Sequence, residues 1–326
     1  MRFRLVDHAD LPACLALFDL HQRCRLSGQV REQLPRLWRE FIAEGRCFPK
    51  PFMLWEDLRP QGKAGIEALG LSMFVRDEVF NELMQDPQPY LADRLYRMEL
   101  EGRRPFLDTR ELANANAGDG VNLVMPFYLQ REHVVDHPDS VKLRPLTAAG
   151  FFFCHAGFRV KNYLGEVFGA PASAYMAAGG LRLTQRFDAP PGMPADSEPH
   201  QHAQTRDETL PGTLNTTALW MTHALQPVLS LTPMQQTIVT FALQGDIDRA
   251  IADRLGVSMD AIKQAWRGIV DRVAPHMPEL RSNDSDTAAP GLAVRGAEKR
   301  RVVLEYLRQH MEELRPWPRR AREQAR

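Results

Sequence analysis

The sequence predicts a chain of two domains, a mixed α/β domain over residues 1–187 and an all-α domain over residues 215–281. Three observations lead to this prediction. The first segment alternates short apolar runs with helical periodicities, whereas the second shows helical periodicity alone. Residues 188–214, between them, carry almost no large apolar side chains. The length of 326 residues also exceeds what one hydrophobic core usually organises.

Local patterns place the elements of the α/β domain. Residues 3–6 have the composition of a strand. Asp10 caps the helix that follows, and Pro12 is tolerated in the first turn of that helix. By the same criteria, further strands are expected over 52–55, 66–75, 121–128 and 180–187, and further helices over 30–44, 77–84, 89–101 and 147–168. Gly169 and Pro171 are expected to end the last of these helices.

Residues 188–214 are predicted to be a disordered linker. Their composition, rich in Pro, Asp, Glu, His, Gln and Thr, cannot bury enough apolar surface to offset the entropy of ordering the chain. His200 and His202 lie in this segment, where solvated histidines are a commoner explanation than a metal site. The four cysteines also lack the spacing of a zinc site. No metal site is therefore expected.

The all-α domain contains start and stop signals for three successive helices. Thr232 caps the first helix, Pro233 fits its first position, and Gly245 ends it. The second helix ends at Gly256, because a glycine there permits the left-handed backbone of a sharp turn between crossed helices. Ser258 then caps the third helix.

The exposed face of the third helix predicts contact with double-stranded DNA. With its isoleucines in the core, this helix presents Lys263, Gln264 and Arg267 to solvent. Such side chains reach base edges or phosphates when a helix lies in the major groove. The basic residues of the domain are balanced by acidic ones, which disfavours strong binding by this domain alone. A three-helix bundle that contacts other proteins is the alternative.

The same residues resemble the helix-turn-helix of the LuxR/NarL family of transcription regulators. The family pattern is L-T-P, a glycine, and I-A-x-x-L-G-[IV]-S-x-x-T-V-K. It is matched by Leu231-Thr232-Pro233, by Gly245, and by Ile251-Ala252-Asp253-Arg254-Leu255-Gly256-Val257-Ser258 followed by Ala261-Ile262-Lys263. The resemblance implies that Ser258, Lys263, Gln264 and Arg267 are the residues that meet DNA. Alanines at 250, 261 and 265 depart from residues that are usual in the family. They predict a weaker affinity for DNA or a preference for a different DNA sequence.

Residues 282–326 are predicted to form a linker, one amphipathic helix and a basic tail. Val302, Val303 and Tyr306 recur at helical spacing. This helix would pack on the preceding domain or pair with its copy in a homodimer, and a homodimer would suit a palindromic operator. The arginines from Arg315 onward would either contact phosphate or remain solvated.

The first domain resembles GNAT-type acetyltransferases at two places. The opening, Phe3-Arg4-Leu5-Val6-Asp7-His8-Ala9-Asp10-Leu11-Pro12, is similar to the first strand and helix of that family. The later segment Phe152-Phe153-Cys154-His155-Ala156-Gly157-Phe158 is similar to its F-Y-x-x-x-G-F. The resemblance implies a GNAT-like fold. An N-acyltransferase that uses acetyl-CoA is therefore the alternative function.

Two departures from that family predict a domain without catalysis and without a cofactor. The family binds the pyrophosphate of acetyl-CoA with a glycine-rich loop, whereas residues 76–80, which follow the strand at 66–75, hold carboxylates and no glycine. Phe153 occupies the place of the tyrosine that serves the family as general acid. Tyr163 is the alternative acid, although no pattern points to it.

The net charge and the distribution of apolar residues limit the functions that this chain can have. The net charge of +0 creates no general attraction to nucleic acid or to anionic membranes, so DNA binding must come from a local face. No signal peptide and no apolar run of about 18 residues occurs, which excludes a membrane span. The sequence thus predicts a cytoplasmic, non-enzymatic transcription regulator that binds promoter or operator DNA. Its GNAT-like domain would dimerise or sense an unknown small-molecule effector.

Overall fold

The computed structural model describes residues 2–21, 23–43, 52–56, 65–132, 137–208, 225–277, 280 and 296–318. The chain forms two compact units, Met1–Ala224 and Leu225–Arg326. Cys47, the start of the predicted linker at residue 282 and the arginines from Arg319 onward lie outside the described ranges. Arg315, which was expected to contact phosphate or remain solvated, is 0% exposed, so that expectation is wrong for this residue. Among the residues so described, no helix combines the length and the apolar character that crossing a bilayer requires.

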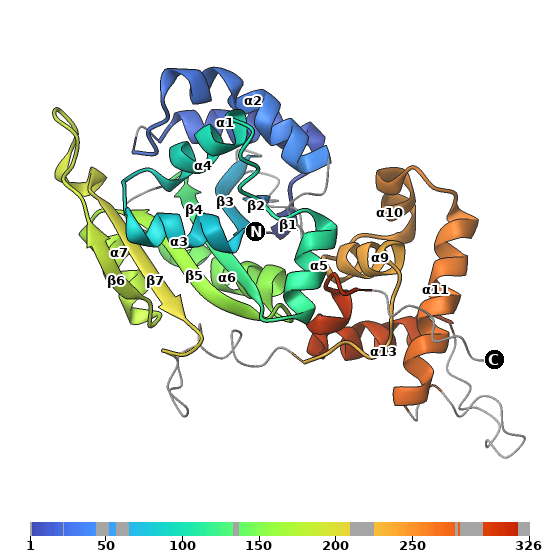
Figure 1. Cartoon of the computed structure of the whole chain (residues 1–326). Helices are drawn as coiled ribbons and strands as arrows, with labels where there is room; N and C mark the ends of the chain where they lie inside the picture. Colours follow the sequence, from blue (N-terminus) through green and yellow to red (C-terminus); the bar gives the residue numbers. More distant parts are fainter. Residues whose placement is uncertain are drawn as a thin grey trace, which may run out of the picture. The chain divides into compact units, whose positions relative to one another are not determined.

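The described part of the first unit is built around a mixed sheet of seven strands in the order β1-β2-β3-β4-β5-β7-β6 (Figure 1). Neighbouring strands run antiparallel except β4 and β5, which run parallel. The strands span Arg2–Leu5 (β1), Phe52–Glu56 (β2), Ile66–Val75 (β3), Val121–Gln130 (β4), Val160–Phe168 (β5), Arg182–Arg186 (β6) and Pro199–Thr205 (β7). The strands predicted from apolar runs are confirmed, with shifts of a few residues at their ends.

Helices cover both faces of this sheet (Figure 1). They span Leu11–Asp19 (α1), Gly28–Ala43 (α2), Asp77–Gln85 (α3), Leu91–Leu100 (α4), Thr109–Ala117 (α5), Pro138–His155 (α6) and Ala170–Ala178 (α7). Side chains of α1 to α4 pack on one face of β3 and β4 in the largest core cluster. Side chains of α5 and α6 pack on the other face. Helix α7 lies against β5, β6 and β7.

A bulge in β4 changes which of its side chains face each layer. Leu71 of β3 pairs with Phe127 of β4. Two residues further along β3, Met73 pairs with Val124, so β4 carries one extra residue at this point. Val124 and Phe127 therefore point to the same core cluster although they are three positions apart, a spacing that places side chains on opposite faces of a regular strand. Pro126, which has no N–H to donate to a ladder, lies inside the bulge.

The helix predicted over residues 147–168 is wrong in its second half. Helix α6 ends at His155, and strand β5 follows. Gly157, with a φ of 85°, has a backbone conformation that interrupts a helix. Gly169 and Pro171 do not end a helix but begin one, because Gly169 is the N-cap of α7 and Pro171 lies in its first turn. Periodicity could not distinguish a short buried strand from a continuing helix.

The disordered linker predicted over residues 188–214 is wrong where the segment contains β7. This strand pairs with β5 on one side and with β6 on the other, so its backbone is satisfied without apolar side chains. His200 and His202, expected in solvent, are 3% and 0% exposed. His202 Nε2 accepts a hydrogen bond from Ser173 Oγ at 2.8 Å, and its Nδ1 donates to the Leu181 carbonyl at 3.3 Å. Partners within the fold order this segment.

The described part of the second unit is built of helices. They are α9 (Pro233–Leu243), α10 (Asp248–Leu255), α11 (Met259–Val273), α13 (Gly296–Gln309) and two 3₁₀ helices, η3 (Ala274–His276) and η4 (Met311–Leu314). Thr232 and Ser258 cap α9 and α11 as predicted, because their hydroxyls accept N–H groups of the first turn, both at 3.2 Å. Gly256 ends α10 with a left-handed φ of 64°. The predicted caps and turn are confirmed.

Helix α13 and the segment after it pack within the second unit. The Arg300 guanidinium lies 4.4 Å from the centroid of the Trp266 ring and forms an ion pair with Asp248 at 2.6 Å. Trp266 Nε1 donates to the same carboxylate at 3.1 Å. Glu313, 2% exposed, accepts two backbone N–H groups of the segment before α9. Packing on the preceding helices is thus the arrangement observed for α13.

Candidate functional site

The parallel strands β4 and β5 separate partway along their length. They pair from Val121 and Val160 as far as Met125 and Gly165. Beyond this point β4 remains paired with β3, and β5 remains paired with β7. The bulge at Pro126 bends β4 where the separation begins. Among the described residues, the inner edges of β4 and β5 have no strand partner beyond this point, so the sheet opens between them.

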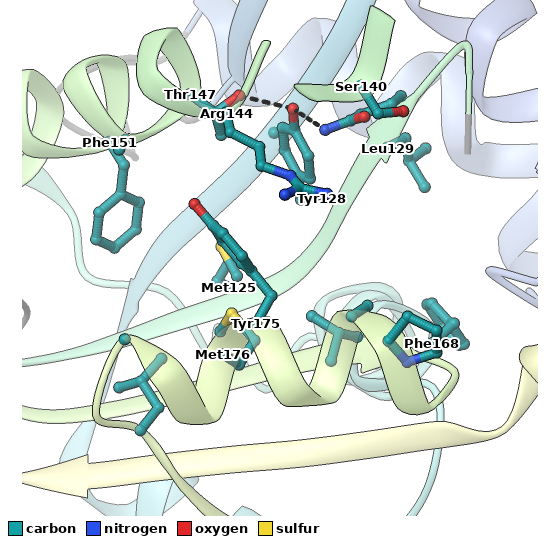
Figure 2. Close-up of a pocket in the computed structure, with 18 of the residues that line it drawn as sticks. Met125, Tyr128, Leu129, Ser140, Arg144, Thr147, Phe151, Phe168, Tyr175 and Met176 are labelled. Carbon is teal, nitrogen blue, oxygen red and sulfur yellow. Dashed lines mark hydrogen bonds between the residues drawn. The ribbon is translucent and has the colours of Figure 1, made fainter. Parts of the chain in front are cut away.

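A cavity of about 610 Å³ lies over this opening (Figure 2). Residues of β4, β5, α6 and α7 form most of its lining. Its walls are mostly apolar and aromatic, with large side chains such as Met125, Leu129, Phe151, Phe168 and Met176. A concave, mainly apolar cavity of this size is typical of small-molecule binding sites.

A few polar side chains interrupt the apolar wall. Arg144 of α6 and Tyr175 of α7 lie across the cavity from each other, with the guanidinium carbon 5.8 Å from the ring centroid (Figure 2). Tyr128 of β4 has its hydroxyl 2.8 Å from Thr147 Oγ1, and it accepts a hydrogen bond from Gln130 Nε2 at 2.8 Å. Burial raises the pKa of Tyr128 to about 12. Its hydroxyl is therefore protonated and already has partners.

Tyr163 of β5 lies next to the point where the strands separate. Its side chain is 1% exposed, and its hydroxyl donates to Met125 Sδ at 3.7 Å, a weak acceptor. Burial raises the pKa of Tyr163 far above its ordinary value, so the phenol stays protonated. Gly165, two residues along the strand, leaves room for this ring, because a β-carbon there would lie 2.9 Å from Tyr163 Cζ.

The segment after β4 decides how a nucleotide thioester such as acetyl-CoA would fit. The segment between β4 and the helix beside the parallel pair is residues 131–137, whereas the segment tested in the sequence was 76–80. Four of these seven residues lie outside the described ranges, and the segment also contains no glycine. At the start of α6, Pro138 has no N–H, and the Asp139 N–H donates to His137 Nδ1 at 3.2 Å. The sequence of this segment therefore offers no glycine-rich loop of the kind that holds phosphate at a helix N-terminus.

The position expected for a catalytic tyrosine lies away from the cavity. Phe153 lies on α6 and does not line the cavity, and its ring centroid is 5.7 Å from that of Phe3. Tyr175 of α7 lines the cavity instead. Its sequence signal is Tyr175-x-x-x-Gly179 before a strand, the spacing that had been matched at residues 152–158. No helix was predicted over residues 170–178, so this second match was not considered.

The residues predicted to meet DNA lie together on α11. Lys263, Gln264 and Arg267 are all exposed on one side of this helix. The Lys263 ammonium forms an ion pair with Asp260 at 3.2 Å. Ser258 is exposed at the N-cap of α11, where its hydroxyl accepts the Ala261 N–H. None of the four lines the cavity of the first unit.

Ser72, His155 and Glu166 are buried polar residues of the first unit that have partners within the fold. His155 Nδ1 donates to the Phe151 carbonyl at 2.7 Å, and Ser72 Oγ donates to His155 Nε2 at 2.7 Å. Glu166 accepts two backbone N–H groups at the start of α4, both at 3.0 Å. Ser72, His155 and Glu166 do not line the cavity. Within the described ranges, no three side chains of His, Cys, Asp or Glu are grouped as a metal ion would require.

Comparison with known proteins identifies no family, because no family model and no curated protein match the chain. Among solved structures, similar ones include a variant of the spermidine N-acetyltransferase SpeG from Vibrio cholerae, which is 8% identical over 63% of this chain and 95% of that chain, with a TM-score of 0.34. An N-acetyltransferase from Staphylococcus aureus is 10% identical over 62% and 96%, with a TM-score of 0.34. The GNAT-like decarboxylase GphF, in complex with isobutyryl-CoA, is 14% identical over 63% and 99%, with a TM-score of 0.35.

Two of the similar structures are described as GNAT-like, the fold class that the resemblance implied for the N-terminal part of this chain. Three of eight similar structures are named as N-acetyltransferases and two are described with CoA or an acyl-CoA, so the expectation that the chain is not an enzyme is withdrawn. The comparisons give no support to the LuxR/NarL resemblance of the second unit. At TM-scores of 0.34 to 0.38 the likeness assigns no substrate and no residue role to this chain.

Proposed function

We propose that the first unit is an acyltransferase that takes its acyl group from a thioester bound between β4 and β5. The observation that carries this proposal is the separation of the two parallel strands after Met125 and Gly165, beneath the cavity between α6 and α7. A sheet that opens in its middle exposes backbone donors and acceptors next to an apolar chamber. That combination suits a long ligand with amide groups and an apolar end.

The pantetheine arm of an acyl thioester has this character. Its amide groups lie along an extended chain and would pair with the inner edges of β4 and β5 in the way that an added strand pairs with a sheet edge. Met125, Phe151 and Met176 would surround the acyl group and the sulfur atom. The guanidinium of Arg144 would bind the phosphate at the far end of the arm.

The test measures acyl transfer by the full-length chain. Acetyl-CoA and acetyl-pantetheine serve as donors, a panel of primary amines serves as acceptors, and chromatography measures the thiol that is released. Two neighbouring alanines of α6 supply matched variants: Ala148 lines the cavity, whereas Ala149 is exposed and does not. Ala148→Trp fills the cavity, and Ala149→Trp adds the same bulk outside it.

We expect transfer by the wild type and by Ala149→Trp, and a loss of at least about tenfold in Ala148→Trp, because the tryptophan occupies the space of the acyl arm. Isothermal titration with a non-hydrolysable thioether of pantetheine should show similar affinities for the wild type and Ala149→Trp and a lower affinity for Ala148→Trp. Absence of transfer with both donors, together with absence of thioether binding, would contradict the proposal. Equal rates in the two tryptophan variants would place the site elsewhere.

A second candidate function belongs to the second unit, which we propose binds double-stranded DNA. The observation that favours it is the exposure of Lys263, Gln264 and Arg267 on one side of α11, which follows the left-handed turn at Gly256. These side chains are of the types that read base edges and phosphates from a helix in the major groove. Asp260, paired with Lys263, reduces the local positive charge, so modest affinity is expected.

The DNA proposal is tested with duplexes selected from a random pool. The Lys263→Ala, Arg267→Ala double variant should lose binding and show a shallower dependence of affinity on salt, because it contacts fewer phosphates. Arg308→Ala, which removes a positive charge from the exposed side of α13, is the matched control and should bind as the wild type does. Recovery of palindromic sites would support a homodimer as the binding species. If the selection enriches no duplex, the proposal that the second unit binds DNA is contradicted.

A further inference from the structure

The hydroxyl of Tyr163 is a strong hydrogen-bond donor in a buried place that offers it only a weak acceptor. The phenol is 1% exposed, and its O–H points to the thioether sulfur of Met125 at 3.7 Å. A buried hydroxyl without a good acceptor costs stability, and a phenylalanine would pack there without that cost. Fold stability therefore does not explain why this side chain is a tyrosine.

The hydroxyl lies beside the opening between the strands. Tyr163 and Met125 both line the cavity, and Met125 pairs with Gly165 in the last rung that joins β4 to β5. The absence of a side chain at Gly165 is what gives the phenol ring its space. A ligand that follows the opening to its closed end would bring its terminal group to the Tyr163 hydroxyl.

We infer that Tyr163 is a catalytic residue, whose O–H donates a hydrogen bond to the carbonyl oxygen of the bound thioester and to the oxyanion that forms there. This inference rests on the proposed acyl transfer. The amine nitrogen attacks the carbonyl carbon and forms the C–N bond, while the carbonyl π pair moves to the oxygen. When the intermediate collapses, that pair returns, the C–S bond breaks, and the thiolate receives through solvent the proton that the nitrogen loses.

The other two tyrosines of the cavity are less suited to this role. The hydroxyl of Tyr128 is already engaged with Thr147 and Gln130. Tyr175 is 49% exposed, so water competes for its hydrogen bonds. In contrast, the environment of Tyr163 excludes water, and in such an environment a fixed donor acts most strongly on a developing negative charge.

The experiment compares Tyr163→Phe with Tyr96→Phe in the full-length chain. Tyr96, 0% exposed, belongs to the core on the other face of the sheet, where its hydroxyl accepts a hydrogen bond from Trp38 Nε1 at 2.9 Å. For Tyr163→Phe we expect kcat to fall by about 10²-fold while KM stays within about twofold, because the donor acts on the transition state. Tyr96→Phe should lower the melting temperature without lowering kcat.

The outcomes separate this inference from the proposed function. If the wild type transfers no acyl group, the proposed function fails and this inference with it. If the wild type is active and Tyr163→Phe keeps its kcat, only the role of Tyr163 is overturned. If Tyr163→Phe does not fold, Gly165→Ala replaces it as the test, because this variant retains the Tyr163 hydroxyl but moves it. Gly165→Ala must then lower kcat while its affinity for the pantetheine thioether stays unchanged. Wild-type kcat in that variant would also overturn the inference.

Discussion

A β-carbon on Gly165 would lie 2.9 Å from Cζ of Tyr163, and closer still to the phenol oxygen. The two residues are separated by one position on β5 and face the same side of the sheet. Gly165 also forms the last pair that joins β5 to β4. The glycine thus determines both where the sheet opens and where the buried hydroxyl lies.

Gly165→Ala is expected to lower the free energy of unfolding by about 1–3 kcal/mol, because the methyl group must displace a ring that is packed in the core. The measurement is urea unfolding at neutral pH. Gly28→Ala is the control, since a β-carbon at Gly28 meets nothing within 4 Å and alanine favours a helix over glycine. Equal unfolding free energies for the two variants would show that Tyr163 moves without cost.

Glu166 makes folding depend on pH. Burial raises the pKa of this carboxyl from 4.5 to about 7, although Gln201 and two backbone N–H groups donate to it. Between these values the unfolded chain loses the proton and the folded chain keeps it. Stability from this group is therefore complete below pH 4.5 and falls as pH rises to about 7, by roughly 3 kcal/mol. Urea unfolding across this range should show a decline that Glu166→Gln flattens. Parallel curves for the two proteins would contradict the assignment.

The described cysteines are expected to resist alkylation in the native chain. Cys14, Cys24 and Cys154 are all buried, and burial raises the pKa of Cys14 to about 12 and that of Cys24 well above its ordinary value. Since the thiolate is the reactive form, these groups should react only after unfolding. Peptide mapping after brief treatment with iodoacetamide at pH 8, with and without urea, measures this. Rapid native labelling of Cys14 or Cys24 would show that the core opens readily.

Ser258→Ala is expected to destabilise the start of α11 by about 1 kcal/mol, because the serine hydroxyl accepts the Ala261 N–H that would otherwise lack a partner. Hydrogen exchange of peptides that cover α11 should become several-fold faster. Gln264→Ala, at an exposed position of the same helix, is the control and should leave the exchange rates as they are. Similar rates in all three proteins would mean that the cap contributes nothing to this helix.

Much of the secondary structure could be predicted, because its causes are local. Thr232, Ser258 and Gly256 act on backbone groups within a few residues, so the boundaries of α9, α10 and α11 follow from the sequence. The extended apolar runs of β3 and β4 were likewise identified from composition. In contrast, β7 holds buried polar side chains that find partners far along the chain, and no local pattern indicates such a strand.

The cavity could not be predicted, since it arises where two strands that are adjacent in space separate. Tyr163 stood among the candidates only as an alternative acid, because its strand was assigned to a helix. Tyr175 was not considered, because no helix was predicted over residues 170–178. The predicted DNA contacts on α11 follow from helical spacing alone. They depend on no contact outside one helix, and they remain a prediction for the binding experiments.

The amino-acid sequence by itself determined the helix caps, the apolar runs and the exposed face of α11, because backbone hydrogen bonds and side-chain periodicity act over a few residues. Only the tertiary structure decided that β5 follows α6, that β7 joins the sheet, and that Tyr163 is buried beside the opening between β4 and β5. Strand pairing and burial depend on contacts between segments that are distant in sequence, so they stabilise the chain only once the sheet has formed.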